Sequence, residues 1–371
     1  MERKKSLFSK EEINTGRQPF MDIAKAIAIL FMVEIHLLMY AAEGIYDTHP
    51  VFSFISDIFT GGVFAAPVFM FCMGVGIAYS RSSKHPLLAK RGLDLYIKSW
   101  LLNIARGTIA YLIAYFVTKE AEYLTGAVFF TTILDILQFA ALAFFLMDLL
   151  KLLKLKEEII FLISVAMSVA GSFLRYIELD NYPLSVAVGH FVGAEHENFE
   201  ACFPLFNWFI FVAGGLLFGK IIRKCGNVKK LLGILFAISL PIMIVYNVIA
   251  IPRNIGIYSS ELAYYYMTSV DAVYAFSAVF IMLFISYILA DVMNDKVKTL
   301  CGTISRRINE IYCIHWVLIL SVVVPVANWI FEISINIPVL LVLTVVIFVI
   351  SYFLAGKLEK SKVWNIMMRK K

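Results

Sequence analysis

Charged residues are scarce in this chain: Asp, Glu, Lys and Arg make up 16% of its 371 residues, and 61% are hydrophobic. A soluble domain carries about 25% charged residues. So few charges cannot cover a water-exposed surface, and the sequence excludes an ordinary soluble fold. It predicts an integral membrane protein, with the lipid bilayer as its first partner.

Cysteines and other markers of extracellular or metal-binding proteins are also few. The five cysteines are scattered, and only Cys202 is expected near the outer face, so the sequence predicts neither a disulfide framework nor a metal site. The absence of an internal repeat disfavours the inverted-repeat transporter folds. A polar leader precedes the first apolar run, without a small-residue cleavage site, so we expect it to be retained.

Long apolar runs recur along the whole chain. A bilayer core of about 30 Å needs about 20 apolar residues, and backbone groups in lipid must pair within their own segment. The runs therefore predict an all-α, polytopic membrane bundle of about ten transmembrane helices, forming one domain over 1–371. The predicted spans are 20–41, 58–80, 94–117, 131–150, 158–175, 203–221, 231–250, 270–291, 309–330 and 335–356, with 1–19 as a cytoplasmic leader and 176–202 as a long outer loop.

Basic residues orient these spans. In the ten-span arrangement, 27 of the 33 Lys and Arg residues fall on one side, which the positive-inside rule assigns to the cytoplasm together with both termini. The net charge of +6 then belongs to a surface that meets anionic lipid, and no nucleic-acid partner is expected. The Lys- and Ile-rich composition suits a bacterial cytoplasmic membrane, with an organelle membrane as the alternative.

The first span carries a polar stripe. Lys25 and His36 are eleven residues apart, which leaves a residual angle of about 20° and an axial rise of about 16 Å on a helix. Arg17 and Asp22 lie at its cytoplasmic end. Ionisable groups in a membrane mark functional sites, so we predict an inner mouth for an anionic ligand and a proton-accepting His36 in the outer third. The alternative is snorkelling cations and an interhelical hydrogen bond for His36.

The third and fourth spans repeat this pattern. Arg91 and Lys98 are two turns apart at the cytoplasmic end, where both can meet the same inner ligand. Asn103 and Arg106 lie deeper, and Arg106 needs a partner near mid-membrane. Asp135 is the predicted partner, in either a structural ion pair or a catalytic one.

Four further features complete the set of candidates. His315, in "EIYCIHWVLI", is expected in the inner part of the ninth span, either lining the path of the donor or packing between helices. His49 is expected in an outer loop just above the first span. Gly215 and Gly219 have the spacing of close helix packing. The acidic loop 176–202 could meet an external substrate or form a solvated cap.

Several segments resemble the transmembrane acyltransferases, namely the acyltransferase 3 family and the heparan-α-glucosaminide N-acetyltransferase group. "RQPFMDIAKAIAILFMVEIH" is similar to their first-helix signature, and Lys25 and His36 keep the acyltransferase 3 spacing of a basic residue eleven positions before a His. "ISRRINEIYCIHWVLI" is similar to a late helix of that family. Likeness to the glucosaminide group lies in "AAPVFMFCMGVGIAYSR", "LLAKRGLDLYIKSWLLNIAR", "DILQFAALAF" and "FPLFNWFIFVAGGLLFGKIIRK".

The resemblance implies an enzyme that takes an acyl group, acetyl being the expected one, from cytoplasmic acyl-CoA without a metal. The acceptor would be a hydroxyl or amine of an extracytoplasmic sugar, cell-envelope glycan or small molecule. His36 would act as general base or acyl carrier, with His49 as the second choice, and Asn103 or Arg106 would stabilise the oxyanion. The predicted donor-binding residues are Arg17, Asp22, Lys25, Arg91, Lys98 and His315.

Two other classes remain open from the sequence. A carrier or channel could line its path with the same polar stripe, and a silent sensor or scaffold could retain it. Binding of CoA would favour the enzyme, whereas uptake without acyl-CoA would favour the carrier. The acceptor, the choice between O- and N-acylation, and the oligomeric state, with a homodimer as one option, are not specified by the sequence.

Overall fold

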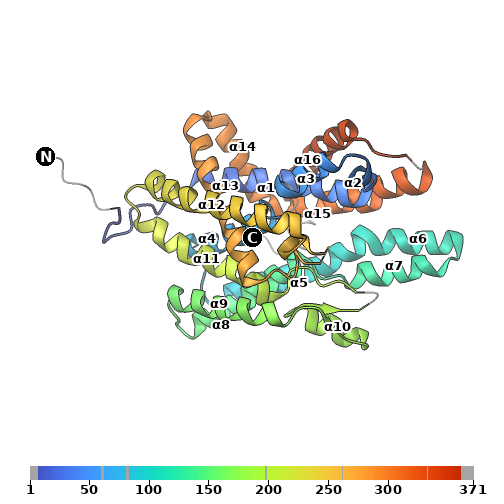
Figure 1. The fold of residues 1–371 in the computed structure, drawn as a ribbon, viewed down its shortest axis with the longest axis horizontal. Helices are drawn as coiled ribbons and strands as arrows, with labels where there is room; N and C mark the ends of the chain where they lie inside the picture. The colour runs from blue at the N-terminus through green and yellow to red at the C-terminus, as the bar shows by residue number, and fades with distance from the viewer. Residues whose placement is uncertain are drawn as a thin grey trace. The chain divides into compact units, whose positions relative to one another are not determined.

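The computed structural model describes residues 7–59, 62–80, 83–196, 199–260, 262–331 and 333–360, and within these ranges the regular elements are helices apart from one pair of two-residue strands (Figure 1). The predicted class, an all-α polytopic membrane protein, is confirmed. Seven helical segments within these ranges are long and apolar enough to cross a membrane: Pro19–Ala41, Leu87–Thr118, Leu205–Lys224, Val228–Tyr258, Ser269–Val292, Ile308–Ala327 and Ile337–Lys360.

The other three predicted spans hold shorter helices: α4 (Ala66–Tyr79) has 14 residues, and α8 (Ile136–Leu152) and α9 (Glu157–Phe173) have 17 each. The count of ten spans and the cytoplasmic placement of both termini stay predictions. Part of the basic charge behind that placement lies outside the described residues, namely Arg3, Lys4, Lys5, Arg81, Lys362, Arg369, Lys370 and Lys371.

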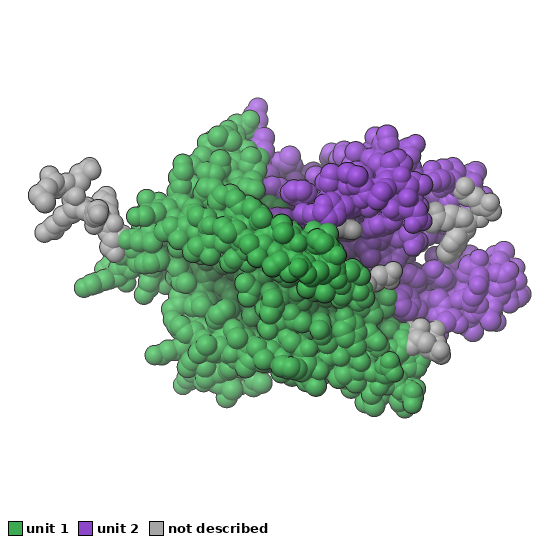
Figure 2. Space-filling model, in the orientation of Figure 1, with its two compact units in different colours: residues 1–24, 66–96, 134–294 green, residues 25–65, 97–133, 295–371 purple. Residues whose placement is uncertain are grey.

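The chain divides into two compact units of interleaved segments, with residues 1–24, 66–96 and 134–294 in the first and 25–65, 97–133 and 295–371 in the second (Figure 2). Helices α1 (Pro19–Ala41) and α5 (Leu87–Asn103) each begin in the first unit and end in the second. The first unit also holds α4, α8, α9, β1 (Ile177–Glu178), α10 (Tyr182–Gly189), β2 (Ala194–Glu195), α11 (Leu205–Lys224), α12 (Val228–Arg253), η2 (Gly256–Tyr258) and α13 (Ser269–Val292).

Helix α11 is the centre of the first unit and packs against α4 and α9. A Cβ added at Gly215 would lie 2.0 Å from the carbonyl oxygen of Phe71, and one added at Gly219 would lie 2.6 Å from the Cβ of Ala78. The two helix backbones are therefore in direct contact. This confirms the prediction that the two glycines serve close helix packing.

The predicted outer loop 176–202 has regular structure over much of its length. Strands β1 and β2 pair in parallel on either side of α10, and Glu178 lies opposite Glu195 in the register. Burial, and then the facing carboxylate of Glu178, raise the pKa of Glu195. Glu197, part of the predicted acidic set, lies outside the described residues.

The second unit is built from helix pairs joined to π-helical turns. Besides the ends of α1 and α5, the elements of this unit are α2 (Gly44–Thr48), α3 (Pro50–Phe59), η1 (Ile104–Thr108), α6 (Ile109–Thr118), α7 (Ala121–Thr132), α14 (Asp295–Arg306), α15 (Ile308–Leu318), η3 (Ile319–Val323), η4 (Pro325–Ile330) and α16 (Ile337–Lys360). Helix α6 packs on α7, and α15 packs on α16. The π-helical turn η1 follows α5, the π-helical turn η3 follows α15, and the two turns are in contact.

The contact between α4 and α11 generates a stability prediction. Gly215→Val forces side-chain atoms into the Phe71 backbone, and overpacking of this kind costs about 1–3 kcal/mol or more. We expect a lower melting temperature in detergent by differential scanning fluorimetry. Gly76→Val is the matched control on α4, because nothing lies within 4 Å of a Cβ added there. Equal melting temperatures for the two variants would contradict the packing described.

Candidate active site

Two histidines of the second unit meet edge to edge. Nδ1 of His36, on α1, lies 2.9 Å from Nε2 of His315, on α15, and the two rings are nearly parallel, with an interplanar angle of 6° and 5.2 Å between their centroids. The other nitrogen of His315, Nδ1, lies 3.2 Å from the carbonyl oxygen of Ile311. His315 is fully buried, whereas His36 retains partial exposure. His36 is therefore the more exposed residue of this pair.

An aromatic wall supports the pair. The Trp316 ring stacks on His36 with 3.9 Å between ring centroids, and Tyr40 meets the edge of the same indole at 5.5 Å. The guanidinium carbon of Arg106 lies 4.8 Å from the centroid of the Trp316 ring. Among the residues described, the buried Nε1 of Trp316 has no hydrogen-bond partner. The cluster thus combines an accessible imidazole, a fixed positive charge and a buried N–H donor.

Arg106 is held in place by its own helix and by a neighbouring one. Its Nη2 donates to Oδ1 of Asn103 at 2.9 Å. The Asn103 amide nitrogen donates in turn to the carbonyl oxygens of Thr131, at 3.2 Å, and Ile133, at 2.8 Å, at the end of α7. The donors of Asn103 are therefore engaged with backbone. This geometry suits Asn103 to orient Arg106 and leaves the guanidinium as the charged group of the cluster.

The π-helical turns bring Arg106 to this position. η1 carries Arg106, and η3 carries Ser321, whose hydroxyl lies 2.9 Å from the Ala105 carbonyl and 3.0 Å from the Arg106 carbonyl. A π-helical turn displaces backbone carbonyls from the regular hydrogen-bond ladder and is often found at functional sites. In hydrocarbon such carbonyls need an internal partner. Ser321 provides it and joins the two turns.

Asp135 has a local role in the first unit. Its Oδ1 accepts from the backbone N–H of Ile136 at 2.7 Å, and its own N–H donates to Oε1 of Gln138 at 3.1 Å. This reciprocal arrangement is a capping box at the start of α8. The ion pair with Arg106 suggested by the sequence stays a prediction.

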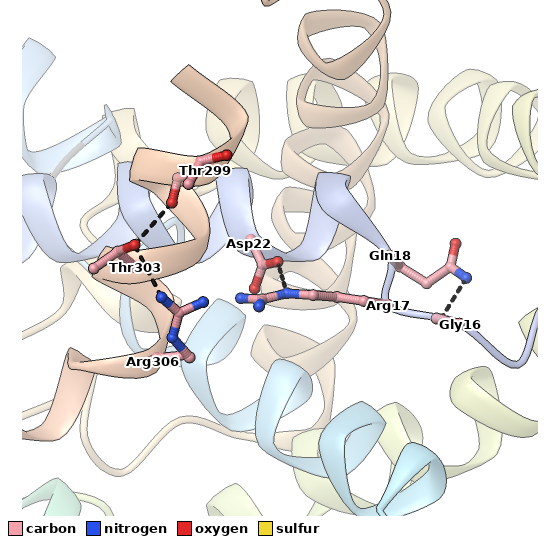
Figure 3. A network of polar contacts seen from close by, with 7 residues as sticks. All are labelled: Gly16, Arg17, Gln18, Asp22, Thr299, Thr303 and Arg306. Atoms are coloured by element: carbon pink, nitrogen blue, oxygen red, sulfur yellow. Dashed lines mark hydrogen bonds and ion pairs between the residues drawn. The ribbon is translucent and has the colours of Figure 1, made fainter. Parts of the chain in front are cut away.

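Arg17 and Asp22 form an ion pair at the start of α1, in the first unit. Nε of Arg17 lies 2.5 Å from Oδ2 of Asp22 (Figure 3). The carboxylate is buried and the arginine side chain is half exposed. The hydrogen bond to Asp22 raises the pKa of Arg17, while partial burial opposes the shift. Asp22 thus orients Arg17 through a charge-assisted hydrogen bond.

The remaining predicted donor-binding cations differ in environment. Arg91 is exposed in the first unit, with its guanidinium carbon 6.0 Å from the centre of the Phe144 ring. Lys25, on α1, and Lys98, on α5, are partly buried in the second unit. Their assembly with Arg17 into one inner mouth stays a prediction.

The predicted outer end of α1 has a cavity of about 170 Å³ in the second unit. Tyr40, which lies one helical turn beyond His36 on α1, is one of the residues that line it. His49 is exposed between α2 and α3, where its Nδ1 lies 2.9 Å from the Thr48 hydroxyl, and it does not line this cavity. The lining residues are Tyr40, Ala41, Ala42, Glu43, Gly44, Ile333, Ser334 and Ile335.

Sequence reasoning separated two residues that the structure brings together. It placed His36 in the outer third of the membrane and His315 in the inner part, whereas their rings are in contact. The depth estimate assumed that every span starts in the same plane, and tilted or displaced helices break that assumption. Trp316 and Ser321 were missed. The adjacency of Trp316 to His315 was the available signal, but it carries no information on what an indole faces.

One family model matches most of the chain. The acyltransferase 3 model, described as an acyltransferase domain, matches residues 18–356, a range that contains every candidate residue except Arg17. No curated protein and no solved structure matches the chain.

The Asp135 capping box yields a prediction that separates capping from ion pairing. Asp135→Ala removes the cap and should cost about 0.5–2 kcal/mol of stability. Asp135→Asn keeps an oxygen for the Ile136 N–H and should preserve most of it. Thermal unfolding of the purified protein in detergent measures both. An Asn variant as unstable as the Ala variant would show that the negative charge, and not the cap, is what matters.

Proposed function

Because the chain belongs to the acyltransferase 3 family and is a membrane acyltransferase, we propose that it uses cytoplasmic acyl-CoA, with acetyl-CoA as the first choice. The acceptor is a hydroxyl or amine of an extracytoplasmic sugar or cell-envelope glycan, and the membrane is a bacterial cytoplasmic membrane. The observation that carries this proposal is the accessible His36 ring beside His315, Trp316 and, across the indole, Arg106.

The donor side of the proposal rests on charge. CoA is a polyanion, and phosphates bind cations that hold fixed positions. Lys25 lies on the same continuous helix as His36, nearly in line with it and about 16 Å away along the axis. A donor anchored near Lys25 therefore extends its thioester along α1 toward His36. Lys98 and Arg91, with Arg17 held by Asp22, supply further charge in this proposal.

The reaction proposed is base-assisted acyl transfer. His36 takes the proton from the acceptor O–H or N–H as that atom attacks the thioester carbonyl carbon. The carbonyl oxygen becomes negative, and the Arg106 guanidinium, oriented by Asn103, stabilises it. Collapse of the intermediate breaks the C–S bond, and the His36 proton passes to the leaving thiolate. A transient acyl-imidazole on His36 is the second route.

The acceptor side of the proposal rests on the cavity at the end of α1. It lies one turn beyond His36 and offers the carboxylate of Glu43 and the hydroxyl of Ser334 beside Tyr40. Aromatic faces with a few convergent polar groups are typical of small-ligand sites. An acceptor approaching from the predicted outer side would pass this cavity before it reached His36. His49, exposed and outside the cavity lining, remains the second candidate histidine.

A first test uses membranes from cells that express the full chain, supplied with radiolabelled acetyl-CoA, so that the membranes themselves supply the acceptor. Removal of a general base costs about 10²–10⁴-fold in rate. We expect His36→Ala to reduce the labelling of the acceptor by about 100-fold or more. We expect His49→Ala to label the acceptor as the parent does.

Undiminished labelling by His36→Ala would eliminate the role of His36, and loss in His49→Ala alone would transfer that role to His49. If solute uptake into vesicles proceeds without acetyl-CoA and stops in His36→Ala, the polar stripe belongs to a carrier instead.

A second test concerns Arg106. Removal of one oxyanion-stabilising group costs about 10²–10³-fold in kcat, so Arg106→Gln should lower the maximal rate by about that factor while the KM for acetyl-CoA changes little. Arg253→Gln is the control, since Arg253 is exposed at the end of α12. A rise in KM at unchanged maximal rate would place Arg106 in donor binding rather than in transition-state stabilisation.

A further inference from the structure

We propose that His315 is a positioning residue that fixes the tautomer of His36, so that the reacting atom is Nε2 of His36. The inference deepens the proposed function and rests on it. It assigns to His315 the orientation of the base, through the contact between His36 Nδ1 and His315 Nε2, rather than a place in the donor site predicted from the sequence.

The tautomers follow from the Ile311 carbonyl. A carbonyl oxygen only accepts hydrogen bonds, so the His315 nitrogen that faces it, Nδ1, carries the hydrogen. A neutral imidazole has one N–H, and therefore Nε2 of His315 is an acceptor. The atom that faces Nε2, Nδ1 of His36, must then be the donor. A neutral His36 that donates from Nδ1 has its lone pair on Nε2.

The opposite assignment is unfavourable. If His315 carried its hydrogen on Nε2, its Nδ1 lone pair would face the Ile311 carbonyl at 3.2 Å, acceptor against acceptor, inside a fully buried site. A polar atom buried without its hydrogen bond is strongly unfavourable. The assignment follows from the hydrogen-bond network, as it does for histidines in general.

Burial disfavours a charged His315 and keeps its ring out of reach of substrates. The ring has no exposed surface and contacts His36, Trp316 and the edge of Tyr312. A second positive charge would also add to that of the Arg106 guanidinium, which lies over the neighbouring Trp316 ring. His315 can therefore accept a hydrogen bond and orient His36, but it does not touch the reacting atoms.

The consequence for the reaction is a fixed proton route. The acceptor proton moves to Nε2 of His36, and the new imidazolium keeps its Nδ1–H bonded to Nε2 of His315. The same Nε2 proton then passes to the departing sulfur, so the pair ends as it began. A base oriented by a third group is a recurrent arrangement in nucleophilic catalysis, and here the third group is a neutral imidazole.

The test is a matched pair of variants in the full-length protein, measured in membranes with radiolabelled acetyl-CoA. His315→Gln keeps an acceptor oxygen near the place of Nε2, and His315→Met has similar length and no strong acceptor. We expect His315→Gln to stay within about tenfold of the parent maximal rate and His315→Met to fall by about 100-fold or more, in the range of general-base loss. The KM for acetyl-CoA should be unchanged in both.

Five outcomes decide the inference and the function on which it rests. Rescue by Gln but not Met, with equal melting temperatures, supports it. Equal activity of the two variants, whether high or low, overturns it, because hydrogen-bond acceptance would then not matter. A raised KM with the maximal rate retained overturns it in favour of donor binding. If His36→Ala is itself fully active, the proposed function has failed; if only His315→Met is active, the function stands and the role of His315 falls.

Discussion

The candidate site in the second unit depends on the hydrogen bond between His36 and His315, because polar side chains in hydrocarbon must find partners inside the protein. Each ring satisfies one nitrogen of the other, and the Ile311 carbonyl satisfies the remaining nitrogen of His315. What is left is Nε2 of His36 on a ring with partial exposure. In the reaction proposed, this atom is the one that takes the proton of the acceptor.

The backbone around this pair is adapted to the same requirement. η1 and η3 depart from regular helix where Arg106 and Ser321 lie, and the Ser321 hydroxyl contacts the carbonyls of Ala105 and Arg106. Asn103 fixes the guanidinium and is itself fixed by backbone at the end of α7. A charge that could otherwise turn toward a headgroup is held beside Trp316. This preorganisation is what a site needs to stabilise an oxyanion without moving.

Much of the fold can be predicted from the length of the apolar runs and from the spacing of residues along each helix. Apolar runs predicted helices throughout, and the spacing of Gly215 and Gly219 predicted close packing of their helix on a neighbour, which the structure shows to be α4. The stripe from Lys25 to His36 lies on one continuous helix as expected. These features depend only on local geometry.

The candidate site was less predictable, because it depends on which helices meet and at what depth. Nothing in "EIYCIHWVLI" states that His315 faces His36, and a depth counted from the end of the span placed the two apart. The position of Asp135 in an apolar run suggested an ion-pair partner for Arg106 and gave no sign that its side chain also forms a helix cap with Gln138. The π-helical turns have no sequence pattern of their own, so the position of Arg106 beside Trp316 could not be predicted from the sequence.

The most direct measurement is an experimental structure of the full chain with a non-hydrolysable acetyl-CoA analogue in a lipid nanodisc. The account predicts CoA phosphates among the cations that precede and begin α1, and a thioester-equivalent carbonyl carbon close to His36. The distance from Nε2 of His36 should leave room for one acceptor atom at about 3–3.5 Å from that carbon. A ligand bound away from α1, or a His36 ring turned toward lipid and apart from His315, would contradict it.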